Sequence, residues 1–127
     1  MINYYIDAFK KYATFSGRAQ RKEYWTCKAV FFGGLCFFSL LLVFFSRNVS
    51  AYPWILGAMA IYVLLNFLPM LAVSARRLHD TGRSGWWLLL PIFPPGWIVI
   101  FIFNLMDSDP NDNRYGPCPK KKVSTKK

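Results

Sequence analysis

The sequence is poor in acidic residues, in histidine and in cysteine. Its 127 residues include 6 Asp and Glu, one histidine and three cysteines. His79 has no His or Cys nearby with which to hold zinc, and the cysteines show neither a C-x-x-C spacing nor a disulfide framework. We therefore expect no metal site and no cofactor, and the length leaves room for one domain.

Charge is also missing from long stretches of the chain. The 18 residues 29–46 and the whole of 48–75 carry no formal charge. Hydrophobic residues make up 54% of the sequence and aromatic residues 19%, while 16 Lys and Arg leave a formal net charge of +10. Basic clusters between long apolar runs favour an anionic membrane surface over nucleic acid as the partner.

Two of the uncharged runs predict transmembrane helices, at 29–46 and 54–75. About 20 apolar residues cross the hydrocarbon core as a helix, and Trp54 marks an interface at the start of the second run. A cleaved signal peptide is disfavoured, because the 28 residues that precede the first run are too many and too aromatic. Within the second span, Asn66 predicts a hydrogen bond to a neighbouring helix and Pro69 predicts a kink.

The first 13 residues predict a short amphipathic helix. Apolar side chains recur on one helical face, at Ile2, Tyr5, Ile6, Phe9, Tyr12 and Ala13. Such a helix either lies in the headgroup layer of a membrane or packs on the rest of the protein. The sequence leaves both alternatives open.

A basic helix is expected to follow, with Ser16 as its cap and Gly17 in the turn before it. Arg18, Arg21 and Trp25 recur on one face of that helix. Arginines followed by aromatic residues are typical of an approach to the bilayer. Residues 1–28 are therefore interpreted as an interfacial, basic N-terminal region.

The stretch 76–85 is expected to be a basic loop between two apolar runs. Its first two arginines close the second span, and Thr81-Gly82 predicts the end of a helix and a turn. His79 and Asp80 resemble an acid–base couple, but neither a nucleophile nor oxyanion donors accompany them. We expect Asp80 to neutralise an arginine and His79 to be an interfacial polar residue.

The third apolar run, 86–106, is interrupted at its middle. Pro91, Pro94, Pro95 and Gly96 divide it into two short halves, and a straight helix through these prolines is disfavoured. Either the run crosses the membrane as one kinked helix, or it re-enters as a hairpin that turns at Pro94-Pro95-Gly96. The kinked crossing is the favoured interpretation, because a re-entrant segment needs a protein shell that a chain this small supplies only by oligomerising.

The distribution of basic residues bears on this choice. Six lie before the first span, one (Arg47) after it, three between the second and third runs, and six after Met106. The positive-inside rule places the N-terminus and the 76–85 loop in the cytoplasm. A single third crossing would put Arg114 and the terminal lysines outside, whereas a hairpin would keep them inside.

The tail, 107–127, is polar and basic. Asp107 begins a run of Asp and Asn that resembles a calcium loop, but the sixth position holds Asp112 instead of glycine and the twelfth holds Cys118 instead of glutamate. We therefore expect no calcium there. Residues 114–117 predict a compact turn, and the lysine-rich end is expected to be disordered.

Three motifs together resemble a known family. F-S-G-R-A-Q-R-K-E-Y-W (15–25), R-R-L-H-D-T-G-R-S-G-W-W (76–87) and N-R-Y-G-P (113–117) are similar to the hallmarks of domain-of-unknown-function family 805 (DUF805), which comprises small bacterial inner-membrane proteins. The resemblance covers nearly the whole chain. It implies a multi-pass protein of the bacterial inner (plasma) membrane and no particular activity. Three charged motifs would form one cluster most simply if the third run were a hairpin.

The expected fold is therefore all-α: a single, polytopic helical membrane domain with two clear spans, a Pro-broken third span or re-entrant hairpin, and an amphipathic N-terminal helix. We interpret the chain as a non-enzymatic module whose cytoplasmic arginine cluster binds anionic lipid headgroups or a partner protein, since guanidinium groups bind phosphate with two parallel hydrogen bonds. The candidate binding residues are Arg18, Arg21, Arg76, Arg77, His79, Asp80, Arg83 and Arg114.

Two other functions remain as alternatives. A small oligomeric transporter or channel component would use Asn66 and the Pro-broken third segment, because discontinuous helices near the midplane bind solutes in transporters. A membrane enzyme acting on a lipid phosphate through His79 and Asp80 is less favoured. The expected partners are the lipid bilayer and its anionic lipids, with a second copy of the chain or another membrane protein as further options and no nucleic acid.

Overall fold

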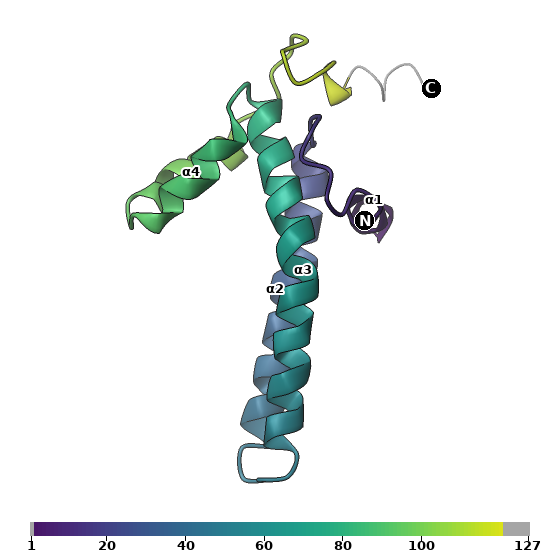
Figure 1. Cartoon of the computed structure of the whole chain (residues 1–127), viewed down its shortest axis with the longest axis vertical. Helices are drawn as coiled ribbons and strands as arrows, with labels where there is room; N and C mark the ends of the chain where they lie inside the picture. Colours follow the sequence, from purple (N-terminus) through teal and green to yellow (C-terminus); the bar gives the residue numbers. More distant parts are fainter. Residues whose placement is uncertain (1, 121–127) are drawn as a thin grey trace.

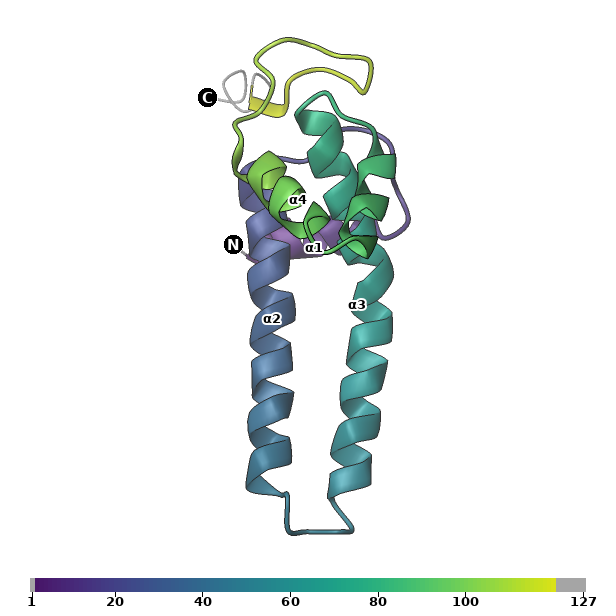
Figure 2. The same cartoon turned by 90° about the vertical axis from the view of Figure 1, so that its left-hand side faces the viewer.

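The computed structural model describes residues 2–120, and these residues form an all-helical protein with a long stem and a polar head (Figures 1 and 2). The elements are α1 (Ile2–Lys10), α2 (Arg21–Phe44), α3 (Tyr52–Asp80), the 3₁₀ helix η1 (Gly85–Ile92) and α4 (Gly96–Leu105). Within residues 2–120 the only strand-like pairing is an isolated bridge between Asn113 and Gly116. The predicted all-α class is confirmed.

The stem consists of α2 and α3, which lie side by side and are joined at the far end by the loop 45–51 (Figure 2). Both are long and apolar enough to cross a membrane. Their 24 and 29 residues correspond to about 36 and 44 Å of helix, more than the roughly 30 Å of the hydrocarbon core. The two predicted spans are therefore present, and each helix continues beyond its apolar run into the head.

The end of α3 corrects one prediction. Residues 76–80 belong to the helix rather than to a loop, and α3 stops at Asp80 with Thr81 as its C-cap. The helix continues because Arg76, Arg77 and Asp80 are buried and paired instead of being solvated. The predicted stop at Thr81-Gly82 is correct, and Gly82 adopts the positive φ of 75° that such a turn favours.

The two stem helices are in close contact near Gly34 and Tyr62. The Tyr62 hydroxyl donates to the Val30 carbonyl over 3.0 Å, and its ring stacks on Phe31 with centroids 6.0 Å apart. A Cβ atom at Gly34 would overlap the Tyr62 phenol, whereas a Cβ at Gly33 would meet nothing within 4 Å. Tyr62 therefore reaches the backbone of α2 because residue 34 is glycine.

Helix α1 packs across the stem at the level where the head begins (Figure 1). The Tyr5 hydroxyl donates to the Asn66 Oδ1 over 2.9 Å, so the predicted hydrogen bond of Asn66 exists and its partner is α1. Ala8 is buried, whereas Ile6 is 44% exposed. A small core lies beneath α1 and is formed by Ala8, Ala19, Tyr24, Cys27 and Val73. One face of α1 thus packs on the protein while the other is open.

The segment 11–20 differs from the basic helix that its spacing predicted. It is irregular, and α2 begins only at Arg21, with Gln20 rather than Ser16 at the N-cap position. Gly17 does make the predicted turn, at φ 90°. The chain stays irregular here because the amide of Ala19 donates to the Arg76 carbonyl over 3.0 Å and the Arg18 side chain is drawn to Asp80, 2.9 Å away.

The third apolar run is a hairpin and not the kinked crossing that we favoured. Helices η1 and α4 pack against each other, with the Trp87 and Phe103 rings 5.5 Å apart, and the chain reverses at 93–95. A Cβ at Gly96 would overlap the Leu90 carbonyl, so the turn requires glycine. With 8 and 10 residues, each arm reaches only about 15 Å, half of a bilayer core.

The hairpin and α1 extend from opposite sides of the stem, and both lie near the head (Figure 1). The hairpin does have a protein shell on one side, where Trp25 of α2 meets Phe101 at 6.2 Å between ring centroids and η1 packs on α3. Its other side is open, with Ile92 74% and Trp97 64% exposed.

The lysines 121, 122, 126 and 127, and with them the disorder expected for the tail, lie outside the described residues.

We expect Gly34→Ala to destabilise the stem, because the new methyl group displaces the Tyr62 phenol from its hydrogen bond. Overpacking of this kind costs about 1–3 kcal/mol. The free energy of unfolding in detergent micelles measures the effect. Gly33→Ala is the matched control, since residue 33 lies on the same helix and faces open space; equal stabilities of the two variants would contradict the packing described here.

The hairpin also predicts that both ends of the chain lie on the same side of the membrane. Reporters fused before Met1 and after Lys127 should therefore show the same accessibility. A reporter inserted in the 45–51 loop should show the opposite accessibility and serves as the control. A C-terminal reporter that matches the loop insertion would require a third crossing and would be incompatible with the hairpin.

Candidate functional site

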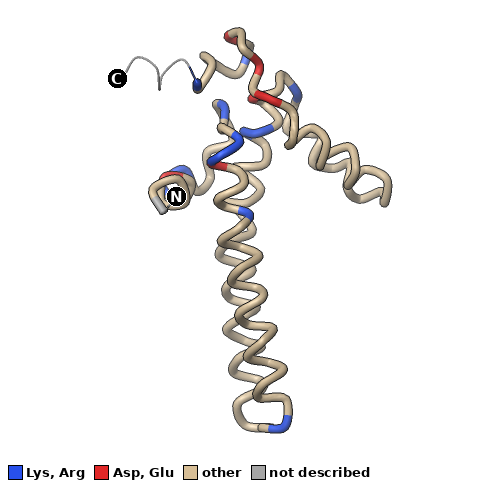
Figure 3. The backbone as a smooth tube through the Cα atoms, turned by 180° about the vertical axis from the view of Figure 1, so that it is seen from behind, with Lys and Arg blue, Asp and Glu red and all other residues tan. Residues whose placement is uncertain are grey.

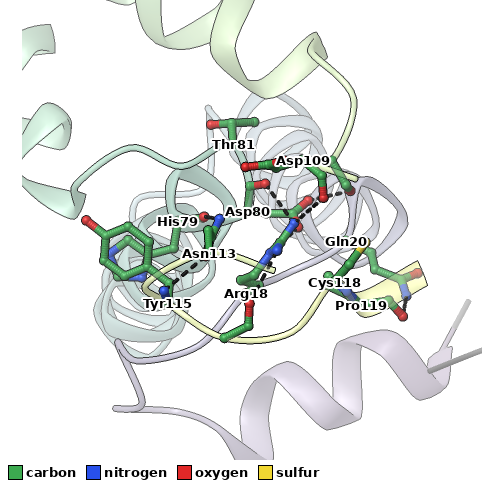
Figure 4. A network of polar contacts seen from close by, with 12 residues as sticks. Arg18, Gln20, His79, Asp80, Thr81, Asp109, Asn113, Tyr115, Cys118 and Pro119 are labelled. Atoms are coloured by element: carbon green, nitrogen blue, oxygen red, sulfur yellow. Dashed lines mark hydrogen bonds and ion pairs between the residues drawn. The ribbon is translucent and has the colours of Figure 1, made fainter. Parts of the chain in front are cut away.

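The three charged motifs meet in the head, around the carboxylate of Asp80 (Figure 4). Asp80 Oδ1 accepts from Arg18 Nε over 2.9 Å, and Oδ2 accepts from Arg77 Nη1 and from Ser108 Oγ, each over 2.5 Å. The side chains of Asp80 and Arg77 are 0% exposed and that of Arg18 is 1% exposed. We call this cluster of Arg18, Arg77, Asp80 and Ser108 the Asp80 network.

Arg18 joins the network to the C-terminal segment. Besides Asp80 Oδ1, its guanidinium group donates to four backbone carbonyls, those of Asp80 (3.1 Å), Asp109 (2.7 Å), Asn111 (2.8 Å) and Gly116 (3.4 Å). A guanidinium group has five N–H donors in a fixed plane, which suits it to bind several acceptors at once. The result is that one side chain holds the residues 109–116 against the end of α3.

Arg77 performs a similar task for the hairpin. Its Nη2 donates to the carbonyl of Met106, the residue that follows α4, and lies 3.4 Å from the carbonyl of Asn104. Asn104 lies in the last turn of α4 and Met106 is its C-cap, where carbonyl groups have no partner within the helix. Arg77 therefore supplies the missing donors and fixes the base of the hairpin to α3.

Arg76 points to a different neighbour, Glu23 of α2. Its Nη1 lies 3.0 Å from Glu23 Oε1, and the Arg76 side chain is 1% exposed. The two stem helices are thus connected by an ion pair just where they enter the head. This pair is separate from the Asp80 network.

His79 does not form an acid–base couple with Asp80. Its ring stacks on Tyr115 with centroids 3.9 Å apart, and its Nδ1 lies 3.2 Å from the Gly17 carbonyl. The His79 carbonyl accepts from the Asn113 side chain over 3.0 Å. His79 therefore connects the 11–20 segment to the turn 113–116, and this turn is closed by the Asn113–Gly116 bridge with Gly116 at φ 128°.

The remaining candidate residues lie at the surface of the head. Arg21 is exposed and its Nη1 is 3.9 Å from Asp107 Oδ1. Arg114 is exposed beside the Tyr115 ring, and Arg83 is half-buried over the Phe103 ring, 3.9 Å from its centroid. The eight candidates thus divide into four buried residues, Arg18, Arg76, Arg77 and Asp80, and four that reach the surface, Arg21, His79, Arg83 and Arg114.

The sequence prediction missed several partners of these candidate residues. Glu23, Ser108 and Asn113 carry side-chain contacts, and backbone carbonyls accept most of the remaining hydrogen bonds. The pairing of Asp80 with an arginine was predicted, because Asp80 stands among arginines, but its burial was not. Carbonyl acceptors leave no signal in a sequence, since every residue has one.

The surface charge of the head includes one perturbed carboxylate. A hydrogen bond from Lys120 Nζ, over 2.5 Å, lowers the pKa of Asp107, and the amide of Ser108 adds to the effect. Asp107 thus stays ionised beside Arg21 and Lys120. Within residues 2–120 no three His, Cys, Asp or Glu side chains gather as metal ligands would.

Comparison with known proteins places this arrangement among membrane proteins. Residues 12–117 match the family model described as a protein of unknown function (DUF805). The chain is 39% identical to the inner membrane protein YhaH of Escherichia coli K12, over 94% of the chain and 98% of YhaH, and 38% identical to YhaI, over 94% and 97%. It is 32% identical to the uncharacterized protein YiiR, over 68% of the chain and 53% of YiiR. No solved structure matches the chain.

We expect Asp80→Asn to destabilise the head strongly, because it leaves the Arg18 and Arg77 guanidinium groups buried without their carboxylate. Breaking a buried ion pair from one side costs about 3–5 kcal/mol. Asp107→Asn is the control: this carboxylate also has two basic neighbours but is exposed, so we expect no measurable change in stability. Thermal unfolding in the same detergent compares the two, and an Asp80→Asn variant as stable as the parent would contradict the role of the network.

Proposed function

The chain belongs to the DUF805 family of proteins of unknown function, and from this premise we propose that it is a non-enzymatic module of the bacterial inner membrane that binds anionic lipid headgroups. The binding surface is the rim of the head, defined by the exposed basic residues Arg21, Lys22 and Arg114. This surface faces the cytoplasm, as the positive-inside rule requires for the more basic end.

The observation that carries the proposal is the sorting of charge along the stem (Figure 3). Among residues 2–120, Arg47 is the one basic residue at the loop that joins α2 to α3, and the other Lys and Arg lie in or near the head. Anionic lipids attract each Lys or Arg near the membrane surface by about 1 kcal/mol. A one-sided distribution therefore both orients the protein and concentrates lipid phosphate around the head.

Burial decides which basic residues bind. Arg18 and Arg77 already donate their hydrogen bonds to Asp80 and to backbone carbonyls. They therefore stabilise the head and do not contact headgroups. Arg21, Lys22 and Arg114 are exposed and can reach phosphate, although Arg21 also lies 3.9 Å from Asp107 Oδ1. The original set of eight candidate residues is accordingly narrowed to the exposed basic ones, to which Lys22 is added.

The two side arms support a position at the membrane interface. Trp86 and Trp97 of the hairpin are 77% and 64% exposed, and Tyr4 and Ile6 of α1 are exposed as well. Trp and Tyr favour the boundary between headgroups and acyl chains. If both arms lie in that boundary, the rim of the head is held among the headgroups.

The geometry lends less support to the two alternative functions. An enzyme would need the Asp80 carboxylate, which is 0% exposed and already binds Arg18, Arg77 and Ser108. A transporter would need Asn66 in a solute path, yet its side chain bonds to Tyr5 and to the Tyr62 carbonyl. The Pro-broken hairpin reaches only part of the way into a bilayer.

We expect the triple variant Arg21→Gln, Lys22→Gln, Arg114→Gln to lose most of its preference for phosphatidylglycerol over phosphatidylcholine. Spin-labelled lipids in nanodiscs report this preference through the fraction of label immobilised at the protein. The preference of the parent should fall as salt rises from about 0.1 M to about 1 M, because the Debye length shortens from about 10 to about 3 Å.

Arg47→Gln is the matched control, since it removes a basic residue from the opposite end of the stem and should leave that preference largely intact. A triple variant with the lipid preference of the parent would overturn the proposal. The same basic rim would then be interpreted as a surface for a partner protein.

A further inference from the structure

A cavity of about 540 Å³ lies on the side of the head above α1 and is unrelated to the exposed rim. Four segments enclose it: α1, the irregular segment 11–20, the beginning of α2, and the turn 115–119. Arg76 of α3 lies among its lining residues. The walls thus come from both ends of the chain and from each of the three charged motifs.

Arg76 is a buried arginine with unused hydrogen-bond donors. Its Nη1 is ion-paired with Glu23 Oε1 over 3.0 Å, whereas Nε and Nη2 have no hydrogen-bond partner among the described residues, although the side chain is only 1% exposed. Arg18, by contrast, binds five acceptors through all three of its nitrogens. A buried donor without an acceptor is costly, so such groups are usually satisfied by a ligand or by water.

The rest of the lining is suited to a phosphate group. Lys11 adds a second positive charge, and Thr14 and Ser16 add hydroxyl donors. Gly17 lines the cavity at φ 90°, and because it has no side chain its backbone can approach a ligand closely. Guanidinium, ammonium and hydroxyl groups gathered around one cavity are typical donors to phosphate oxygens.

Two carboxylates in the same lining restrict the ligand further. Among the lining side chains, Asp7 and Glu23 offset two of the three positive charges of Lys11, Arg18 and Arg76, and Arg18 is already paired with Asp80. A free phosphate dianion gains little in such a cavity, because the two carboxylates repel it. The cavity is better matched to a phosphate that carries its own positive group, which would lie beside Asp7 or Glu23.

We propose that this cavity binds a zwitterionic phosphoester, with the phosphate at Arg76 and Lys11 and an attached ammonium group at Asp7 and Glu23. The headgroup of an aminophospholipid has this chemistry, and so does a small soluble phosphoamine. The site does not depend on the anionic-lipid binding proposed above, because Arg21, Lys22 and Arg114 are not among its lining residues.

The test uses the full chain in phosphatidylcholine nanodiscs, because the quaternary ammonium group of this lipid has no N–H to donate to Asp7 or Glu23. One arm titrates in O-phosphoethanolamine by calorimetry; the other incorporates spin-labelled phosphatidylethanolamine and compares it with spin-labelled phosphatidylcholine. Binding in the first arm identifies a soluble ligand, and selectivity only in the second identifies a lipid headgroup. Either outcome supports the site if Arg76→Gln weakens binding about tenfold or more, the loss expected for one charge-assisted hydrogen bond.

Lys11→Gln provides a second variant should Arg76→Gln fail to fold, because Lys11 is exposed and supports no buried contact. It should also weaken binding, whereas Lys10→Gln should not, since Lys10 is its exposed neighbour and does not line the cavity. Asp7→Asn should shift the preference from phosphoethanolamine toward inorganic phosphate. The proposal is overturned if neither probe binds the parent protein, or if Lys11→Gln binds as the parent does.

Discussion

A single carboxylate, that of Asp80, holds the head of this protein together. Two guanidinium groups and a hydroxyl group surround it, and they come from segments that are 62, 3 and 28 residues away along the chain. Such a charge is stable in the interior only when its partners are fixed in place, because desolvation is expensive. Two arginines share this one carboxylate, so one positive charge remains without a counterion. Hydrogen bonds from Arg18 and Arg77 to backbone carbonyls stabilise it. The end of α3, the base of the hairpin and the turn 113–116 all depend on this arrangement.

The sequence reveals the spans well and the head poorly, for physical reasons. A run of 18 or more apolar residues has few stable options other than a membrane helix, so α2 and α3 are predictable. Asn66 is also predictable as a hydrogen-bonded residue, because an unsatisfied amide in a membrane is costly. Its partner, Tyr5, could not be predicted, because the two residues are 61 positions apart and meet only in the folded protein. The ends of the helices were misjudged because Arg76 and Arg77 look like surface charges until their burial is known.

The hairpin at 85–105 shows how two valid rules can conflict. The need of a re-entrant segment for a protein shell favoured a crossing, while the distribution of basic residues favoured a hairpin. The structure follows the second rule because proline and the close approach of Gly96 to Leu90 divide the run into two arms that are each too short to cross. The sequence allowed us to predict which residue types form the candidate site and that they gather at one end of the stem. Their division into supporting and exposed arginines was not predictable, because residue type alone carries no information on burial.

The hydrogen bonds of Arg18 to the carbonyls of residues 109, 111 and 116 have a consequence for how the protein is made and folded. A nascent chain exposes Arg18 before either stem helix is made, yet three of its five acceptors lie in residues 109–116 and are synthesised only after both stem helices. The stem therefore inserts into the bilayer while Arg18 and Arg77 still lack most of their partners, and the head locks only when the final segment emerges. A chain that ended before Ser108 would leave Asp80 without its hydroxyl donor and would lack three of the five Arg18 hydrogen bonds. Closure of the head is thus a late step of assembly that follows the synthesis of both stem helices.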